Sequence, residues 1–457
     1  MKKALALLCA SAMMGAVLSG CNGSSQSSSS SAAPSSSSSG SSAPQSSASS
    51  ESSEPVSIRY MWWGSQTRHD QNIEMLKMYM EQHPNVTVEY EYGGFDTYWD
   101  KASAMAAANN LPDVWQMSVA YILSYAEKGQ LADMNPYIES GVIDCSDWEE
   151  VFKNLGVVDG KNYGLTLGNS AYCMIYDPDV FAQAGVAEPT LDWTWDDYLN
   201  TIKTITEKTD LYGDCQFPSS IMEGYQQFLR QNGQIGVVNE ARDGLTYKNT
   251  DLWVKLFTMQ KEQLDSGNVI PFDQAVTMQA IEQTGVATGQ SAMMGVVNSN
   301  QAVAAANARG KELKVTCFPH DPNETQPGTF IGPTMFLSLS ESSKNKDATA
   351  ALINFLLNDP EANKICKMEK GVPASAAVRE AVEPLLTETG KAVSQYVGEM
   401  GKIAPPYDNI YAVAYSEVND LYNKLVQDMM FGRIGIEEAG QQFITEADAL
   451  LKAGASK

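Results

Sequence analysis

Two short segments combine tryptophan with hydroxyl, amide and guanidinium side chains, a mixture that suits the holding of a ligand. The first runs from Trp62 to Arg68 with the sequence WWGSQTR, and the second runs from Trp115 to Ser118 with the sequence WQMS. Flat aromatic rings stack on apolar C–H faces, and the polar groups can replace water around a rim of hydroxyls. These residue types can hold a ligand by ring stacking and hydrogen bonding, without a covalent step.

Catalytic signatures are weak by comparison. The chain has 3 histidines, His69, His83 and His320, which lie far apart, and it carries no HExxH, GxSxG or GxxxxGK[ST] pattern. The cysteines that follow Cys21 form neither a disulfide framework nor a CxxC metal site. We therefore predict no catalytic residue, no metal and no cofactor. A glycosidase needs only two carboxylates, so an exported carbohydrate-active hydrolase stays open as an alternative.

The elements that position the two segments read as alternating strands and helices. Alternation predicts strands over 56–62, 86–90 and 111–117, and helical spacing predicts helices over 70–82, 95–109 and 119–128. This order implies a parallel sheet covered on both faces, with ligands bound beyond the carboxyl ends of its strands. Both tryptophan segments lie at such ends. Because neighbours on a strand point to opposite faces, one of Trp62 and Trp63 should pack in the core, and we favour Trp63 for the ligand.

The later chain mixes both kinds of element. Strands are predicted over 163–169, 172–176, 291–297, 313–318 and 334–339, and helices dominate from residue 347 to the end. Thr194 is predicted to cap a helix whose first turn is acidic.

The N-terminus has the organisation of an exported lipoprotein. A basic start at residues 2–3 precedes an apolar run over 4–17, which is too short to span a bilayer. The sequence LSGC that ends at Cys21 then resembles a bacterial lipobox. We predict a signal peptide over 1–20 and a lipidated Cys21 carrying acyl chains such as palmitate, which hold the protein outside the cell membrane. An ordinary signal peptide with an incidental cysteine is the alternative.

Composition bounds the remainder. Serine dominates segment 21–54, which we expect to be a disordered tether behind the lipid anchor. The formal net charge of −24 should repel nucleic acid and anionic lipid, so neither is expected as a partner. No later stretch is apolar enough to cross a membrane. The remaining body is too long for one ordinary core, which suggests two lobes.

A series of motifs runs through this body in a fixed order. They are Trp62-Trp63-Gly64, Leu111-Pro112-Asp113-Val114, Gly129-Gln130-Leu131, Tyr163-Gly164-Leu165, Tyr176–Phe181, Trp193–Asp197 and Gly289–Met294. In this order they resemble the family 1 extracellular solute-binding proteins, the sugar-capturing lipoproteins of ABC importers. The resemblance implies an α/β, two-lobed, type II periplasmic-binding-protein-like fold with a hinge between the lobes. By analogy, lobe I covers 55–169 and 315–358, and lobe II covers 170–314 and 359–457.

The resemblance also implies a function. We expect a monomeric carbohydrate receptor, for an oligosaccharide by preference, that closes on its ligand and delivers it to the permease subunits of an ABC transporter without making or breaking a bond. A receptor for a peptide or a polyamine is the second alternative, because paired acids beside aromatic rings would be hard to see in so acidic a chain.

The predicted ligand contacts come from strand ends and from family positions. They are Trp62, Trp63, Arg68, Trp115, Ser118, Asn169, Tyr172, Tyr225, Asn298, Asn300, Tyr407 and Tyr411. Arg68 has a second interpretation, pairing with an acid. His69 is expected to be a solvated residue at a helix start. Trp193, Trp195 and Trp253 are expected to pack in the core.

Overall fold

The computed structural model describes residues 54–405 and 414–455 of the chain, all within one compact unit, Ser53–Lys457. The predictions on the signal peptide, Cys21, the serine-rich tether, Tyr407 and Tyr411 therefore lie outside the described residues. Among the residues that are described, no helix is both long and apolar enough to cross a membrane.

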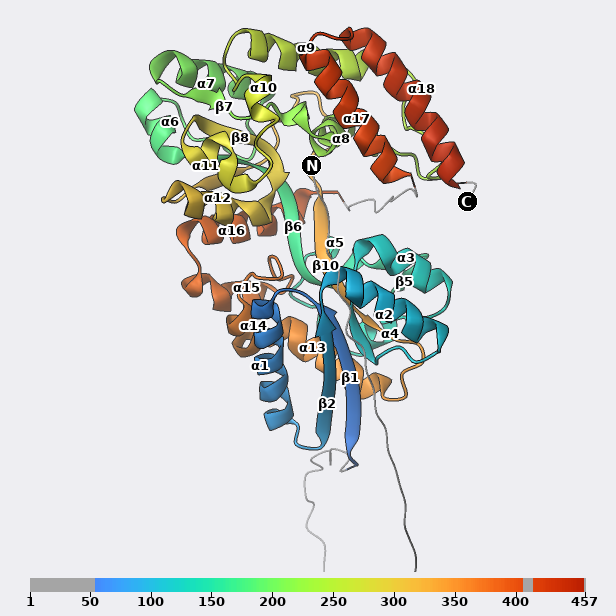
Figure 1. The fold of residues 1–457 in the computed structure, drawn as a ribbon. Helices are drawn as coiled ribbons and strands as arrows, with labels where there is room; N and C mark the ends of the chain where they lie inside the picture. The colour runs from blue at the N-terminus through green and yellow to red at the C-terminus, as the bar shows by residue number, and fades with distance from the viewer. Residues whose placement is uncertain (1–53, 406–413, 456–457) are drawn as a thin grey trace, which may run out of the picture. The chain divides into compact units, whose positions relative to one another are not determined.

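An eight-stranded sheet forms the centre of the fold, in the order β2-β1-β3-β10-β6-β8-β7, with β9 also paired to β6 (Figure 1). Its strands are β1 (Val56–Trp63), β2 (Val86–Gly93), β3 (Val114–Met117), β6 (Leu165–Tyr176), β7 (Tyr212–Asp214), β8 (Ser291–Asn298), β9 (Lys314–Thr316) and β10 (Ile331–Leu339). A separate hairpin pairs β4 (Val157–Val158) with β5 (Lys161–Asn162).

Helices cover this sheet. The first half of the chain contributes α1 (Gln66–Gln82), α2 (Phe95–Ala107), α3 (Val119–Glu127), α4 (Asn135–Glu139), α5 (Glu150–Asn154), α6 (Pro178–Ala184), α7 (Trp195–Lys208) and α8 (Met222–Gln231). The second half contributes α9 (Asp251–Asp265), α10 (Phe272–Ala275), α11 (Gly285–Thr288), α12 (Ala302–Arg309), α13 (Lys346–Asn358), α14 (Pro360–Cys366), α15 (Ala376–Val382), α16 (Glu388–Ile403), α17 (Tyr415–Met430) and α18 (Ile436–Ala455). Short 3₁₀ turns lie at Pro218–Ser220, Ile281–Gln283, Ser299–Gln301 and Glu383–Leu385.

The local signals in the sequence explain where several elements begin. Thr194 caps α7 in a reciprocal capping box with Asp197, which confirms the predicted helix start. Helix α1 begins earlier than predicted, at Gln66, because the hydroxyl of Ser65 accepts from the backbone N–H of Arg68 and satisfies a free donor of the first turn. The two strands predicted over 163–169 and 172–176 are one continuous strand, β6.

The parallel arrangement that we expected for the first three strands is confirmed, and the sheet as a whole is mixed. Strand β1 runs parallel to β2 and β3, whereas β10 runs antiparallel to both β3 and β6. In Figure 1, α1 and α14 lie on one side of β1 and β2, and α2 and α3 lie on the other. The carboxyl ends of β1, β2 and β3 consequently meet at one edge, where α1, α2 and α3 begin.

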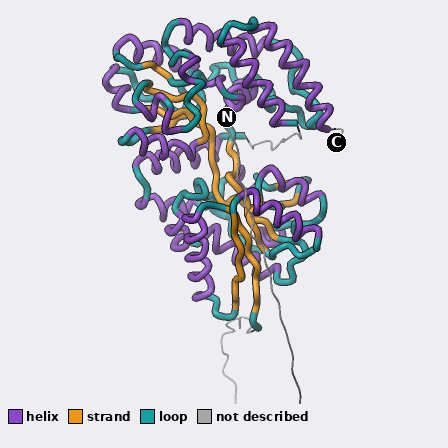
Figure 2. The backbone as a smooth tube through the Cα atoms, viewed as in Figure 1, coloured by secondary structure: helices purple, strands orange, loops and turns teal. Residues whose placement is uncertain are grey.

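Two long strands connect the two ends of the sheet. The first half of β6 pairs with β10, and its second half pairs with β8 and β9; Figure 2 shows both strands running between two groups of helices. The stretch after β9 still bonds to lobe II, because the N–H of His320 donates to the carbonyl of Trp193, just before α7. In contrast, Ser375 bonds to Asp147. We therefore propose that the chain first crosses from lobe I to lobe II inside β6 and returns inside β10, which lies later than the expected boundary at residue 315. We also propose that α14 and α15 belong to lobe I.

Large aromatic side chains fill the interior. Trp253 is fully buried, and the indole N–H groups of Trp193 and Trp195 donate to Cys317 and Gln231, so the predicted packing roles of these three tryptophans are confirmed. The cysteines at 145, 173, 215, 317 and 366 are all buried free thiols. Burial raises the pKa of the Cys145 thiol to about 12.

Candidate ligand-binding site

Aromatic rings gather at the carboxyl ends of the parallel strands. The rings of Trp63, Phe95, Trp99 and Tyr121 form a group that we call the aromatic wall. The Trp63 ring lies 5.4 Å from Phe95, edge to face, and 5.8 Å from Trp99, while Trp99 lies 4.1 Å from Tyr121, centroid to centroid. Phe95 and Tyr121 remain 45% and 37% exposed, so both residues stay partly open to solvent.

Three members of the wall lie at or directly after the end of a strand, and Trp99 follows Phe95 one turn later in α2. Trp63 is the last residue of β1, Phe95 opens α2 directly after β2 and the Gly93-Gly94 pair, and Tyr121 lies in the first turn of α3 after β3. Ser118 caps α3, and its hydroxyl oxygen accepts from the N–H of Ala120. The predicted contact at Ser118 thus lies one turn from Tyr121, half-buried at the same edge.

Trp62 and Trp63 do project to opposite faces of the sheet, as the alternation predicts. Trp63 is 9% exposed and joins the wall, whereas Trp62 is fully buried on the other face. The indole N–H of Trp62 donates to Nδ1 of His69 at 3.1 Å. Trp115 is also fully buried, with its ring 4.9 Å from that of Tyr125. Neither Trp62 nor Trp115 offers surface to a ligand, so we remove both from the proposed contacts.

His69 is not the solvated residue that we expected. Its side chain is buried, and its ring stacks on that of Tyr92 with centroids 4.1 Å apart. Burial, and secondarily the charge of Arg68, lowers the pKa of His69 below its usual value. The neutral ring that results accepts at Nδ1 from Trp62 and carries its proton on Nε2.

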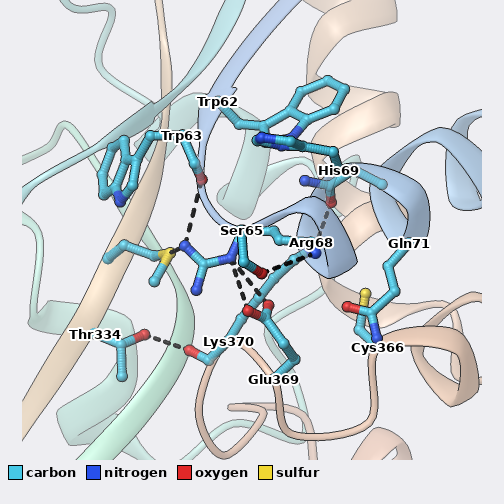
Figure 3. Close-up of polar contacts among 12 residues, drawn as sticks. Trp62, Trp63, Ser65, Arg68, His69, Gln71, Thr334, Cys366, Glu369 and Lys370 are labelled. Carbon is cyan, nitrogen blue, oxygen red and sulfur yellow. Dashed lines mark hydrogen bonds and ion pairs between the residues drawn. The ribbon is translucent and has the colours of Figure 1, made fainter. Parts of the chain in front are cut away.

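Arg68 pairs with an acid, the second of its two interpretations. Its Nε lies 2.9 Å and 3.1 Å from the two carboxylate oxygens of Glu369, and its Nη1 donates to the carbonyl of Trp63 at 3.3 Å (Figure 3). The close-up shows the guanidinium lying between the carboxyl end of β1, at Trp63, and the Glu369–Lys370 loop. Thr334 is also bonded to this loop, through the carbonyl of Lys370. A guanidinium engaged in this way holds the end of β1 rather than a ligand.

A second polar group lies on β6 and β8. Tyr172 is the cross-strand partner of Asn298, whose side-chain amide donates to the hydroxyl of Ser170 at 3.0 Å. Burial raises the pKa of the Glu223 carboxyl in the first turn of α8, although a hydrogen bond with Tyr172 opposes the shift. The structure thus brings together two predicted contacts, Tyr172 and Asn298, beside a carboxyl that the sequence did not single out.

Three other predicted contacts are dispersed. Tyr225 is fully buried among Trp253 and Tyr422, and Asn169 is fully buried, with its backbone N–H and side-chain amide both donating to the carbonyl of Val372. Both are core residues, and we remove them from the proposed contacts. Asn300 is exposed and lines a cavity of about 390 Å³ together with Ser299, Met368 and Glu369.

Sequence reasoning missed Phe95, Trp99, Tyr121 and Glu223. A usable signal was present for the first two: Phe95 directly follows the Gly93-Gly94 pair, shortly after the strand predicted over 86–90, and Trp99 lies about one helical turn further on. Tyr121 could have been found from its place three residues after a helix cap. Within residues 54–405 and 414–455, no group of His, Cys, Asp and Glu side chains is arranged to hold a metal ion.

Comparison with known proteins identifies the family. A family model described as bacterial extracellular solute-binding protein matches residues 74–392. The diacetylchitobiose binding protein DasA of Streptomyces coelicolor is 24% identical over 327 residues, which cover 70% of this chain and 74% of that protein.

Solved structures show the same fold. An extracellular solute-binding protein of family 1 from Alicyclobacillus acidocaldarius superimposes with a TM-score of 0.81 at 24% identity, covering 88% of this chain and all of that one. A periplasmic oligogalacturonide binding protein from Yersinia enterocolitica gives a TM-score of 0.73 at 22% identity, with 88% and 100% covered. The expected two-lobed type II α/β fold is confirmed, and the chain belongs to the bacterial extracellular solute-binding protein family.

Proposed function

We propose that this protein is an exported receptor that captures a carbohydrate, an oligosaccharide by preference, and delivers it to the permease of an ABC importer. The observation that carries the proposal is the aromatic wall, in which Phe95 and Tyr121 stay exposed at the carboxyl ends of parallel strands. The names of two similar proteins, which bind diacetylchitobiose and oligogalacturonide, support the same ligand class.

The charges near the wall favour a neutral sugar. Arg68 is bonded to Glu369, so its guanidinium is not free to pair with an anionic ligand, and the chain as a whole carries a net charge of −24. On the second polar group, Asn298, Tyr172 and the Glu223 carboxyl supply donors and acceptors that can replace water around hydroxyls. Closure of the two lobes would then bring rings and polar groups onto one ligand without any covalent step.

The site that we propose differs from the set expected from the sequence. It comprises Trp63, Phe95, Trp99, Ser118 and Tyr121 on lobe I, and Tyr172, Glu223 and Asn298 on lobe II. Asn300, which lines a separate cavity with Met368 and Glu369, stays a proposed contact outside these two groups. Tyr407 and Tyr411 remain proposed contacts from the segment before α17. We further propose that acyl chains on Cys21 hold the protein at the outer side of the cell membrane and that it works as a monomer with the permease subunits.

Calorimetric titration with a panel of neutral oligosaccharides, peptides and polyamines tests the proposal. We expect heat from at least one oligosaccharide, and a compaction by small-angle scattering in its presence. Phe95→Ala/Tyr121→Ala should weaken that binding by more than about tenfold, since each stacking ring contributes on the order of 1 kcal/mol. Phe431→Ala, which removes an equally exposed ring on the other lobe, is the control.

The alternatives give different results. Silence from every oligosaccharide together with a response to an amine or a peptide would replace sugar by that ligand class. Release of shorter sugars during the incubation, followed by chromatography, would identify a hydrolase.

A further inference from the structure

A second aromatic surface lies on the opposite face of the sheet from the wall. Tyr90 and Tyr92 are 39% and 46% exposed, occupy alternate positions of β2, and therefore point to the same face. Their rings are nearly parallel, with an interplanar angle of 15° and centroids 6.4 Å apart. We call this pair of rings the tyrosine platform. It places two exposed, nearly parallel rings along the end strand of the sheet.

The platform rests on a buried layer that fixes its geometry. The ring of Trp62 lies 5.6 Å from Tyr90 and 5.4 Å from Tyr92, and the ring of His69 stacks on Tyr92. Trp62 itself is held by its hydrogen bond to Nδ1 of His69. Rings supported in this way lose little freedom on binding, so stacking on them is not offset by a large ordering entropy.

The surroundings decide what such a surface can hold. A pyranose ring offers an apolar C–H face that matches a flat aromatic ring, and two exposed rings along one strand can each hold one unit of an extended chain. Another β-strand is a poor occupant, because the exposed carboxylates of Glu89 and Glu91 alternate with the tyrosines along the same strand and protect this edge. The net charge of −24 disfavours an anionic polymer.

We infer that the tyrosine platform is a second carbohydrate-binding surface, which holds a neutral polysaccharide or the outer part of a long oligosaccharide by stacking. The choice of carbohydrate rests on the proposed function, but the surface is separate from the wall: Tyr90 and Tyr92 pack on Trp62, whereas the wall packs on Trp63. A receptor with such a surface would stay close to the polymer from which its short ligands are released.

Affinity electrophoresis of the folded body in gels that contain arabinan, xyloglucan, glycol chitin or dextran tests this inference. We expect at least one polymer to retard the wild-type protein. Tyr90→Leu/Tyr92→Leu keeps apolar volume over Trp62 but removes the flat faces, and it should weaken retardation by about tenfold. Tyr90→Phe/Tyr92→Phe keeps both rings and should be retarded like the wild type. Phe431→Ala controls for loss of an exposed ring elsewhere.

The outcomes separate this inference from the proposed function. Unchanged binding of a short oligosaccharide by the leucine variant, with lost retardation, supports two separate surfaces. Retardation by none of the four polymers, or equal retardation of wild type and leucine variant, overturns the inference and leaves the wall untouched. The inference is also overturned if the wild-type protein is a dimer, the leucine variant is a monomer, and retardation is the same for both. In that case the platform would bind a second copy of this chain and not a polysaccharide. If the wild type is retarded, the leucine variant is not, and neither binds any short sugar, the proposed function is refuted and the inference on the platform stands.

Discussion

Arg68 and Glu369 form a partly buried ion pair that ties the first turn of α1 to the loop after α14, across 301 positions of sequence. The same guanidinium donates to the carbonyl of Trp63 at the end of β1. Gly64 makes this arrangement possible, because a Cβ at that position would lie 2.5 Å from Cδ of Arg68. The pair thus fixes the strand end from which the aromatic wall begins.

Removing the cation should destabilise this junction. In Arg68→Met, the Glu369 carboxylate, with its side chain 23% exposed, loses its partner. We expect the free energy of unfolding to fall by about 2 kcal/mol, as measured by chemical denaturation. Glu369→Gln and the double variant complete a mutant cycle. Strictly additive effects of the two substitutions would contradict a direct interaction.

The neighbouring tryptophans should separate stability from ligand binding. Trp62→Phe loses the hydrogen bond to His69 in the core, so we expect a loss of about 1–2 kcal/mol in unfolding free energy, with the affinity for a short oligosaccharide at the aromatic wall unchanged. Trp63→Ala removes a ring from the wall and should weaken sugar affinity by more than about tenfold. Calorimetry and denaturation on the two variants check both statements. If sugar affinity were lost only in the Trp62 variant, the ligand would bind on the Trp62 face of the sheet, and Trp63 would be a packing residue.

His320 should make stability depend on pH in the alkaline range. Its contacts with the Cys317 thiol and with the Glu324 carboxylate, 2.5 Å from Nδ1, raise the pKa of His320 to about 10. A raised pKa in the folded state means that the stabilisation is complete below about 6.5 and is lost as the pH rises towards 10. Glu324→Gln should flatten this loss.

The measurement for His320 is denaturant unfolding at intervals from pH 6 to pH 10. Glu361→Gln, which removes an exposed carboxylate paired with Lys364, serves as the control and should follow the wild type. Parallel curves for the wild type and Glu324→Gln would show that the imidazolium is not held by that carboxylate.

Hydrophobic periodicity predicted most elements, since strand alternation and helix caps are local. The strands over 56–62 and 86–90 and the cap at Thr194 follow from side chains within a few residues of each other. The mixed character of the sheet could not be read in this way. It depends on β10, which arrives from residue 331 and inserts antiparallel between β3 and β6. Nothing in the local sequence fixes that partner.

The candidate site was harder for the same reason. The sequence identified strand ends correctly, but exposure is decided by what packs from elsewhere. Trp115 is covered by Tyr125 and Trp99, while Phe95 is left open. His69 is buried because Tyr92 of the next strand lies on its ring. Residue type indicated a sugar site, and tertiary contacts selected its members.

Asp214 provides a test of an interior charge. The carboxyl is fully buried in the second lobe, where it accepts from the hydroxyl of Tyr198 at 2.9 Å and from the N–H of Gln216 at 3.1 Å. Burial raises the pKa of Asp214 to about 7, although these hydrogen bonds oppose the shift. Between about pH 4 and pH 7 the folded protein therefore keeps a proton that the unfolded chain has released.

Stability should consequently fall as the pH rises through that interval, by roughly 1.4 kcal/mol per pH unit from this one group. Asp214→Asn removes the titration but keeps the contacts, because the amide oxygen can still accept from Gln216 and the amide N–H can donate to the Tyr198 oxygen. Unfolding free energies of wild type and variant should therefore diverge from pH 4.5 to pH 7.5 in favour of the variant. The other carboxylates are common to both proteins and cancel in the difference. A difference that stays constant over this range would mean that Asp214 is ionised in the folded state at pH 4.5, and that its two hydrogen bonds outweigh the cost of burial.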